Sequence, residues 1–145
     1  MSLSNWLEKG WLVKHRPDRR ETRELLGIAE RDITDAQAKG ISTDTRLSLA
    51  YNGALQLAIA ALAASGYRAS HEAHHYRAIQ SLAFTINASI DLVDQLDTFR
   101  KKRNISDYER AGAVSDQEAK EMLALAKILR EMVTAWLKKN YPHLI

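Results

Sequence analysis

A long uncharged, alanine-rich segment limits what this chain can fold into more than any other feature. Residues 47–67 contain no charged side chain, and a segment of that length could cross a bilayer. Alanine dominates it, however, and Ser48, Asn52 and Gln56 are polar, so its transfer into lipid is only weakly favourable. We therefore predict a helix buried at the centre of a helical protein. Asn52 and Gln56 then need hydrogen-bond partners in the interior or at a subunit contact.

Apolar residues at helical spacing predict two helices that flank a short turn. The first is expected after Pro17 and ends at Gly40, with an apolar face formed by Thr22, Leu25, Leu26, Ala29, Ile33 and Ala36. Ser42 or Thr43 then caps the uncharged helix, which runs to Gly66.

Two more long helices are predicted in the second half of the chain. Ser70 opens a third helix that continues to about Arg100, because no glycine or proline interrupts residues 67–111. The fourth begins with a capping box formed by Ser115 and Glu118, and it ends near Asn140. With no alternating strand pattern in competition, these signals predict an all-α protein. The expected architecture is a single antiparallel up-and-down four-helix bundle over residues 1–145, with a short extra N-terminal helix around residues 5–8.

Composition favours a cytoplasmic location and excludes a dedicated nucleic-acid arm. Cysteine is absent, and the N-terminus lacks the basic start and long apolar run of a secretory signal. The 21 basic and 18 acidic residues give a net charge of only +3. Any attraction to a polyanion must therefore come from local clustering of cations. We expect no cofactor and no membrane contact.

One such cluster lies where the third helical pattern ends. Its members are the cations Arg100, Lys101, Lys102 and Arg103, followed by the polar residues Asn104, Asp107 and Tyr108. The guanidinium of Arg103 can grip a phosphate through two parallel hydrogen bonds, while the lysines attract a polyanion as point charges. The structural alternative is that these cations answer the dipole at a helix C-terminus and solvate a turn.

Several segments together resemble the HEPN superfamily. They are residues 42–58, residues 66–68, residues 74–77, and the pairs Arg103 and Asn104, Tyr108 and Glu109. The resemblance implies a helical, homodimeric domain, often paired with a minimal nucleotidyltransferase in toxin–antitoxin operons. It also implies a metal-independent endoribonuclease, with Arg103, Asn104 and Tyr108 at the catalytic position and Arg100, Lys101, Lys102 and Asp107 binding substrate.

The chain departs from the motif of that superfamily at one chemically important position. The superfamily places a histidine after the arginine with a spacer of four to six residues between them, but this chain holds Tyr108, Glu109 and Arg110 at those positions. Histidine can transfer a proton near neutral pH, whereas an unperturbed tyrosine with a pKa of about 10 stays protonated. The sequence therefore predicts engagement of RNA or nucleotides, with cleavage left open. The alternative is a non-catalytic dimerisation or protein-interaction module.

A second motif points to a different chemistry. His71, Glu72, Ala73, His74 and His75 match H-E-x-x-H, which on a helix presents two imidazoles to zinc. A catalytic zinc needs a third ligand, and Asp94 would lie roughly 28 Å from His75 along one continuous helix. We therefore predict no metal site here, and His75 is expected on the apolar face of its helix. A zinc-binding protein that uses this segment is the remote alternative.

Overall fold

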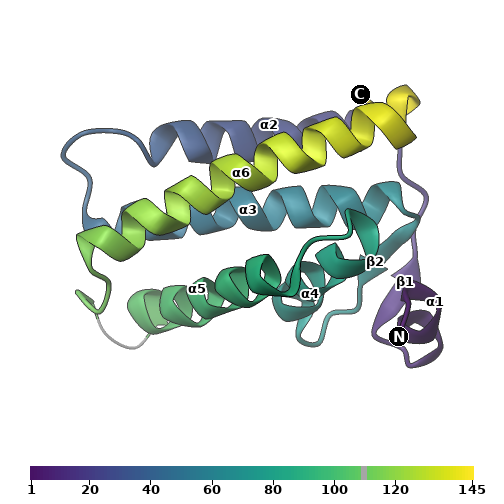
Figure 1. Ribbon diagram of the computed structural model, residues 1–145, viewed down its shortest axis with the longest axis horizontal. Helices are drawn as coiled ribbons and strands as arrows, with labels where there is room; N and C mark the ends of the chain where they lie inside the picture. Colours follow the sequence, from purple (N-terminus) through teal and green to yellow (C-terminus); the bar gives the residue numbers. More distant parts are fainter. Residues whose placement is uncertain (109–110) are drawn as a thin grey trace.

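The computed structural model describes residues 1–108 and 111–145, with the side chains of residues 106–108 excepted. Figure 1 shows a mostly helical molecule in which long helices lie along one another and a small two-stranded unit sits at one end. The α-helices are α1 (Leu3–Glu8), α2 (Arg19–Asp35), α3 (Thr43–Ala64), α4 (His74–Thr85), α5 (Ile90–Tyr108) and α6 (Asp116–Asn140). The strands are β1 (Leu12–Lys14) and β2 (Tyr67–Ala69), and a 3₁₀ turn, Pro142–Leu144, follows α6.

Helix α3 is the central element, as its uncharged sequence predicts. It contacts α2, α4, α5 and α6, and in Figure 1 it lies between α2 and α6 on one side and α4 and α5 on the other. In the described chain it is the one helix long and apolar enough to cross a membrane, yet 72% of its most apolar window is buried by the rest of the protein. This burial confirms the prediction of a core helix.

Helix α3 packs closely against α2 at Gly53. A Cβ atom built on Gly53 would lie 2.8 Å from Cγ1 of Ile33 and 3.3 Å from the carbonyl oxygen of Ala29. Both α2 residues are buried, so neither has open space to move into. The absence of a side chain at Gly53 therefore sets the separation of the two helices.

The prediction of one continuous third helix is wrong. The chain forms two helices, α4 and α5, separated by a turn at residues 86–89. Asn87 adopts a left-handed conformation with φ 57°, and the hydroxyl of Ser89 accepts a hydrogen bond from the N–H of Leu92 to cap α5. Asparagine tolerates positive φ and serine caps helices, so the pair ends one helix and starts the next without glycine or proline.

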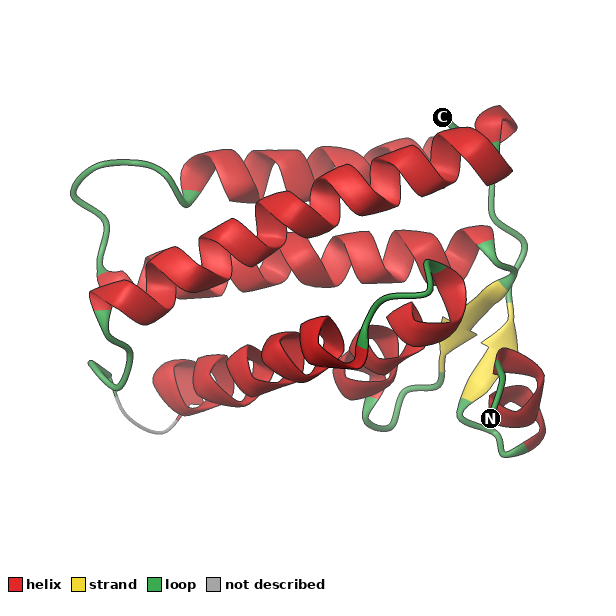
Figure 2. Ribbon diagram, in the orientation of Figure 1, coloured by secondary structure: helices red, strands yellow, loops and turns green. Residues whose placement is uncertain are grey.

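The expectation of a purely helical protein is also too simple. Strands β1 and β2 pair antiparallel, with Val13 opposite Arg68, and Figure 2 shows them beside α1. Each strand has only three residues, which is too short for an alternating pattern to show in the sequence. The buried ring of Trp6 packs edge-on against Trp11 and Phe84, so this unit closes one end of the helical core.

The last helix, α6, begins as predicted, but the sequence alone does not indicate which helices it packs against. The side chain of Ser115 accepts a hydrogen bond from the N–H of Glu118, and the Glu118 carboxylate accepts one from the N–H of Ser115. This confirms the predicted capping box. Helix α6 makes its main contact with α3 and only a slight one with α5, its neighbour in sequence. The opening between α5 and α6 follows from this packing.

Replacement of Gly53 by alanine should destabilise the fold. The added methyl group would overlap Ile33 in a closely packed interior, and such overpacking costs about 1–3 kcal/mol. We expect a lower free energy of unfolding in urea, with a lower transition midpoint.

The matched control is Gly27→Ala on α2. Gly27 also lies within a helix, but a Cβ atom there would meet nothing within 4 Å. The higher helix propensity of alanine should stabilise this variant by up to about 1 kcal/mol. Equal stability of the Gly53→Ala variant and the wild type would contradict the tight α2–α3 contact.

Candidate functional site

Arg103 of the predicted basic cluster lines a polar hollow between α2, α3 and α5. The hollow has a volume of about 370 Å³. Two arginines and two aspartates face it together with hydroxyl and amide groups. The lining residues are Arg31, Asp32, Asp44, Thr45, Ser48, Leu49, Asn52 and Arg103. Below, this feature is called the Arg103 hollow.

A buried carboxylate forms one wall of the Arg103 hollow. Asp32 is only 3% exposed, and its Oδ2 accepts a 2.6 Å hydrogen bond from Nδ2 of Asn52. Its Oδ1 accepts a 3.0 Å hydrogen bond from Nε of Arg31. Gln56 donates in turn to Oδ1 of Asn52 at 3.4 Å. The two polar residues of α3 therefore find the partners inside the protein that the sequence requires, and Asp32 is held in a fixed orientation.

A second carboxylate lies at the N-terminal end of α3. Oδ2 of Asp44 accepts a 2.8 Å hydrogen bond from the backbone N–H of Gly112, which precedes α6. Its Oδ1 is buried and has no hydrogen-bond partner among the described residues. Next to it, the hydroxyl of Thr43 donates to Oδ1 of Asp116. These contacts fasten the start of α3 to the segment that leads into α6.

The four adjacent cations of α5 do not form one patch. Arg100 donates from Nε to Asp97 at 2.7 Å, and Nζ of Lys101 lies 3.5 Å from the other oxygen of the same carboxylate. Nζ of Lys102 lies 2.9 Å from the Glu118 carboxylate on α6. Since successive residues of a helix point about 100° apart, only Arg103 of the four reaches the hollow.

The structure describes the other predicted residues of the cluster only in part. Asn104 belongs to α5 and is half-buried. Asp107 and Tyr108 belong to the last turn of α5, but their side chains lie outside the described residues, as does Glu109 entirely. Their predicted roles therefore remain predictions.

Tyr51 of α3 lies beneath Arg103. The Cζ atom of Arg103 is 5.6 Å from the centre of the tyrosine ring, within the range of a cation–π contact. Tyr51 is 0% exposed, and its hydroxyl has no hydrogen-bond partner among the described residues. Burial raises the pKa of Tyr51 to about 12, despite the opposing effect of Arg103 and Arg100. The hydroxyl is therefore protonated at any physiological pH.

A histidine of α4 contacts the same tyrosine ring. The ring centres of His75 and Tyr51 are 6.4 Å apart, and His75 is half-buried. Burial lowers the pKa of His75, and the neighbouring His74, Arg103 and Arg100 lower it further. His75 is therefore neutral at pH 7.

Only the last two residues of the H-E-x-x-H segment, His74 and His75, lie on a helix. Helix α4 begins at His74, because Ala73 adopts a left-handed conformation with φ 54°, so His71 and Glu72 belong to the preceding turn. The prediction that Ser70 opens this helix is wrong. Within the described ranges, no three histidine, aspartate or glutamate side chains come close enough together to hold a metal ion.

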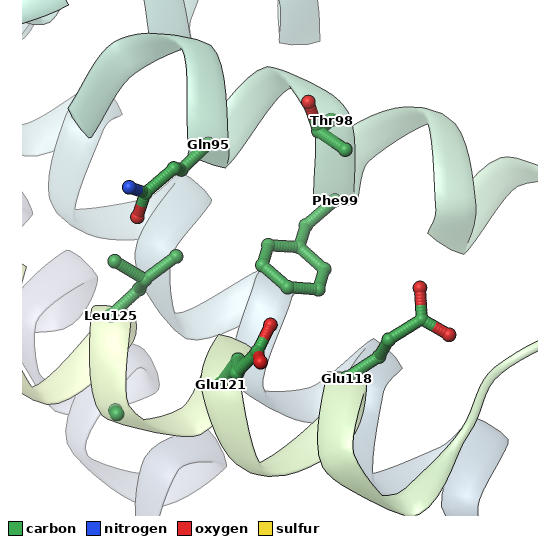
Figure 3. Close-up of a pocket in the computed structure, with 7 residues that line it drawn as sticks. Gln95, Thr98, Phe99, Glu118, Glu121 and Leu125 are labelled. Atoms are coloured by element: carbon green, nitrogen blue, oxygen red, sulfur yellow. The ribbon is translucent and has the colours of Figure 1, made fainter. Parts of the chain in front are cut away.

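A separate groove lies between α5 and α6. Figure 3 shows Phe99 of α5 pointing toward α6, along which Leu125, Glu121 and Glu118 follow one another. Its volume is about 550 Å³. Ile128, 51% exposed, lies one turn beyond Leu125 on the same face of α6, so the apolar surface continues out of the groove.

Comparison with known proteins adds no family to these observations. No protein-family model matches the chain, and no match was found among the curated proteins. The resemblance to the HEPN superfamily therefore stays a prediction, and the function must be argued from the geometry of the hollow.

Sequence reasoning missed most of the wall of the Arg103 hollow. It singled out Arg103 and Asn52 but not Arg31, Asp32 or Ser48. One signal for Asp32 was present, since it lies three residues after Ala29 and thus on the apolar face predicted for its helix. A carboxylate on a buried face must be paired, which marks it as a candidate for a polar site.

Replacement of Tyr51 by phenylalanine should stabilise the protein. The hydroxyl is buried and has no hydrogen-bond partner among the described residues, and its removal recovers a desolvation cost of about 1 kcal/mol or more. The gain should increase with pH. Because the pKa is about 12 in the folded protein and 10 when unfolded, ionisation favours the unfolded wild type above about pH 10.

The measurement is urea unfolding of both proteins at neutral and alkaline pH. Tyr67→Phe, which removes a half-buried tyrosine hydroxyl elsewhere, is the control. A lower stability of Tyr51→Phe at pH 7 would show that the Tyr51 hydroxyl has a partner after all.

Proposed function

We propose that this chain is a HEPN-like protein that engages RNA or nucleotides at the Arg103 hollow. In this proposal α4 and α5 together take the place of one helix of an antiparallel up-and-down four-helix bundle. The observation that supports the function best is the meeting of Arg103 with Arg31, Asp32 and Asn52 in one hollow.

The chemistry of the lining fits a ribonucleotide. The guanidinium groups of Arg103 and Arg31 suit the oxygens of a phosphate. The carboxylate of Asp32 and the hydroxyl of Ser48 can accept hydrogen bonds from the hydroxyl groups of a ribose. A volume of about 370 Å³ lies within the range of small-ligand sites, which is sufficient for one nucleotide unit. Arg100, Lys101, Lys102 and Asp107 are proposed to attract or contact the flanking strand.

Replacement of Arg103 by alanine should weaken the binding of labelled single-stranded RNA. Loss of one phosphate contact should also reduce the slope of the logarithm of affinity against the logarithm of salt concentration, by about 0.7 for a single strand. The measurement is fluorescence anisotropy over a salt series. Circular dichroism checks that the variant remains folded.

Two variants locate the effect. Lys138→Ala removes the same charge from the last turn of α6, away from the hollow, and should leave RNA affinity unchanged. Lys102→Ala removes a cation of α5 that faces Glu118 instead of the hollow and is proposed only to attract the flanking strand, so its loss of affinity should be smaller than that of Arg103→Ala. A larger loss from Arg103→Ala than from Lys102→Ala supports the hollow, whereas no RNA binding by the wild type at low salt would refute the proposal.

The alternative function is homodimerisation without nucleic acid. The groove between α5 and α6 favours it, because Phe99, Leu125 and the exposed Ile128 form an apolar face of the kind found at subunit contacts. The occupant proposed is a second copy of this chain. A nucleotidyltransferase-type antitoxin is a further partner that the HEPN resemblance implies, in the cytoplasm.

Replacement of Ile128 by lysine should dissociate such a dimer. The substitution places a charge within the proposed apolar contact, where it loses its hydration. We expect light scattering to report a dimer for the wild type and a monomer for Ile128→Lys at the same concentration. Lys127→Ala, on the next residue of α6, should remain dimeric. A monomeric wild type would remove this alternative.

A further inference from the structure

Arginines and aromatic rings alternate along a path that leads from α5 across α4 to the N-terminal end of the chain. Arg100 lies one helical turn before Arg103 on α5, and its Cζ atom is 5.4 Å from the centre of the Tyr76 ring on α4. The Cζ atom of Arg77 lies at the same distance from that ring. It also lies 3.6 Å from the ring of Trp11, which precedes β1. Each of these contacts is short enough for a cation–π interaction.

The path ends in a small pocket beside the ring of Trp11. The pocket has a volume of about 220 Å³ and lies between the N-terminal unit and the start of α4. The exposed Lys9 adds a further cation at this end, since its Nζ lies 4.7 Å from the centre of the Trp11 ring. Below, this feature is called the Trp11 pocket. Its lining residues are Gly10, Trp11, Ser70, Glu72, Ala73 and Arg77.

Hydrogen bonds of Ser70 hold the Trp11 pocket in shape. The Ser70 hydroxyl donates to the carbonyl oxygen of Gly10 at 2.6 Å, and the Ser70 N–H donates to the carbonyl oxygen of Trp11 at 2.9 Å. Trp6, which is 6% exposed, packs into the end of the core, whereas Trp11 is only half-buried. Part of the Trp11 ring therefore remains at the surface, where a ligand can reach it.

We propose that the Trp11 pocket binds a base of the same single-stranded RNA whose phosphate lies at the Arg103 hollow. This inference rests on the proposed function and narrows its ligand from RNA or nucleotides to a strand of several nucleotides. In this arrangement Arg100 and Arg77 contact phosphates between the two sites, and a base stacks at Trp11. Cations that follow the backbone and aromatic rings that stack on bases are the usual means of holding a single strand.

The chemistry of the Trp11 pocket fits a base without its sugar and phosphate. The pocket is smaller than the Arg103 hollow, and a base can stack on a guanidinium plane as well as on an aromatic ring. The Glu72 carboxylate can accept a hydrogen bond from the amino group of cytosine, which uracil lacks. Bases inside a duplex are already stacked on both faces, so the ligand must be single-stranded.

The test compares the affinities of the wild type and its variants for cytidine monophosphate and for cytidylate strands of up to about a dozen residues, a length typical of single-strand sites. Wild-type affinity should rise with strand length, because a longer strand occupies both sites at once. Trp11→Ala should lose about 5- to 150-fold in affinity for the longest strand, as loss of one stacked base requires, and retain its affinity for the monophosphate. Arg103→Ala should weaken the binding of every length.

A matched pair of arginines locates the effect. Arg77→Gln removes a cation from the Trp11 pocket and should lower affinity for the longest strand. Arg68→Gln removes the same charge from β2 at the same end of the molecule, but Arg68 is exposed and does not line the pocket. Its affinity should stay close to that of the wild type.

Tryptophan fluorescence separates contact with RNA from a structural role of Trp11. Stacking of a base on the indole ring should quench part of the wild-type emission when the longest strand binds. Trp11→Phe keeps a ring in the N-terminal unit, so it should remain folded while this part of the quenching disappears.

The inference fails if affinity of the folded Trp11→Ala variant rises with strand length as steeply as that of the wild type. It also fails if the longest strand quenches the wild type and Trp11→Phe equally. Binding that still depends on Arg103 would leave the proposed function standing in both cases. Absence of any binding by the wild type at low salt would remove both proposals together.

Discussion

The contact between α2 and α3 at Gly53 is the constraint on which the candidate site depends. With no Cβ atom at that position, the helices approach until Ile33 rests against the backbone of α3. Asp32 precedes Ile33 on α2, and Asn52 precedes Gly53 on α3. These two residues are then close enough for a 2.6 Å hydrogen bond. The close packing at Gly53 and the hydrogen bond from Asn52 to Asp32 therefore depend on the same separation of the helices. A wider spacing of α2 and α3 would leave a buried charge without its donor.

Two buried polar groups near the hollow differ in how far hydrogen bonds offset their desolvation. Asp32 is buried but receives hydrogen bonds from Asn52 and Arg31, so its desolvation is offset. Tyr51 is buried too, yet its hydroxyl has no partner among the described residues. An uncompensated polar group beneath an arginine is a departure from what stability alone favours. Such departures concentrate where a protein binds or reacts with something.

The sequence predicted the parts of the fold whose signals are local. The uncharged helix, its Ser42 cap and the capping box of Ser115 and Glu118 all follow from neighbouring residues, and the structure contains them. The break between α4 and α5 was missed because asparagine and serine do not exclude a helix as proline does, and only the backbone reveals that Asn87 has a positive φ. The sequence draws attention to Arg103 through its charged neighbours, whereas it does not place Arg31 and Asp32 beside Arg103, because helix packing alone brings them together.

The hydrogen bond from Gly112 to Asp44 joins residues that are 68 positions apart, so it bears on when the hollow is completed. During synthesis, α2 and α3 leave the ribosome first, and Asp32 and Asn52 can pair early. Arg103 and Gly112, whose N–H donates to Asp44, emerge only after α4 and most of α5. A ribosome-bound chain that still lacks these residues has half of the hollow and no Arg103 in it. The nascent protein consequently carries the Arg103 hollow in unfinished form until the segment with Gly112 has been made.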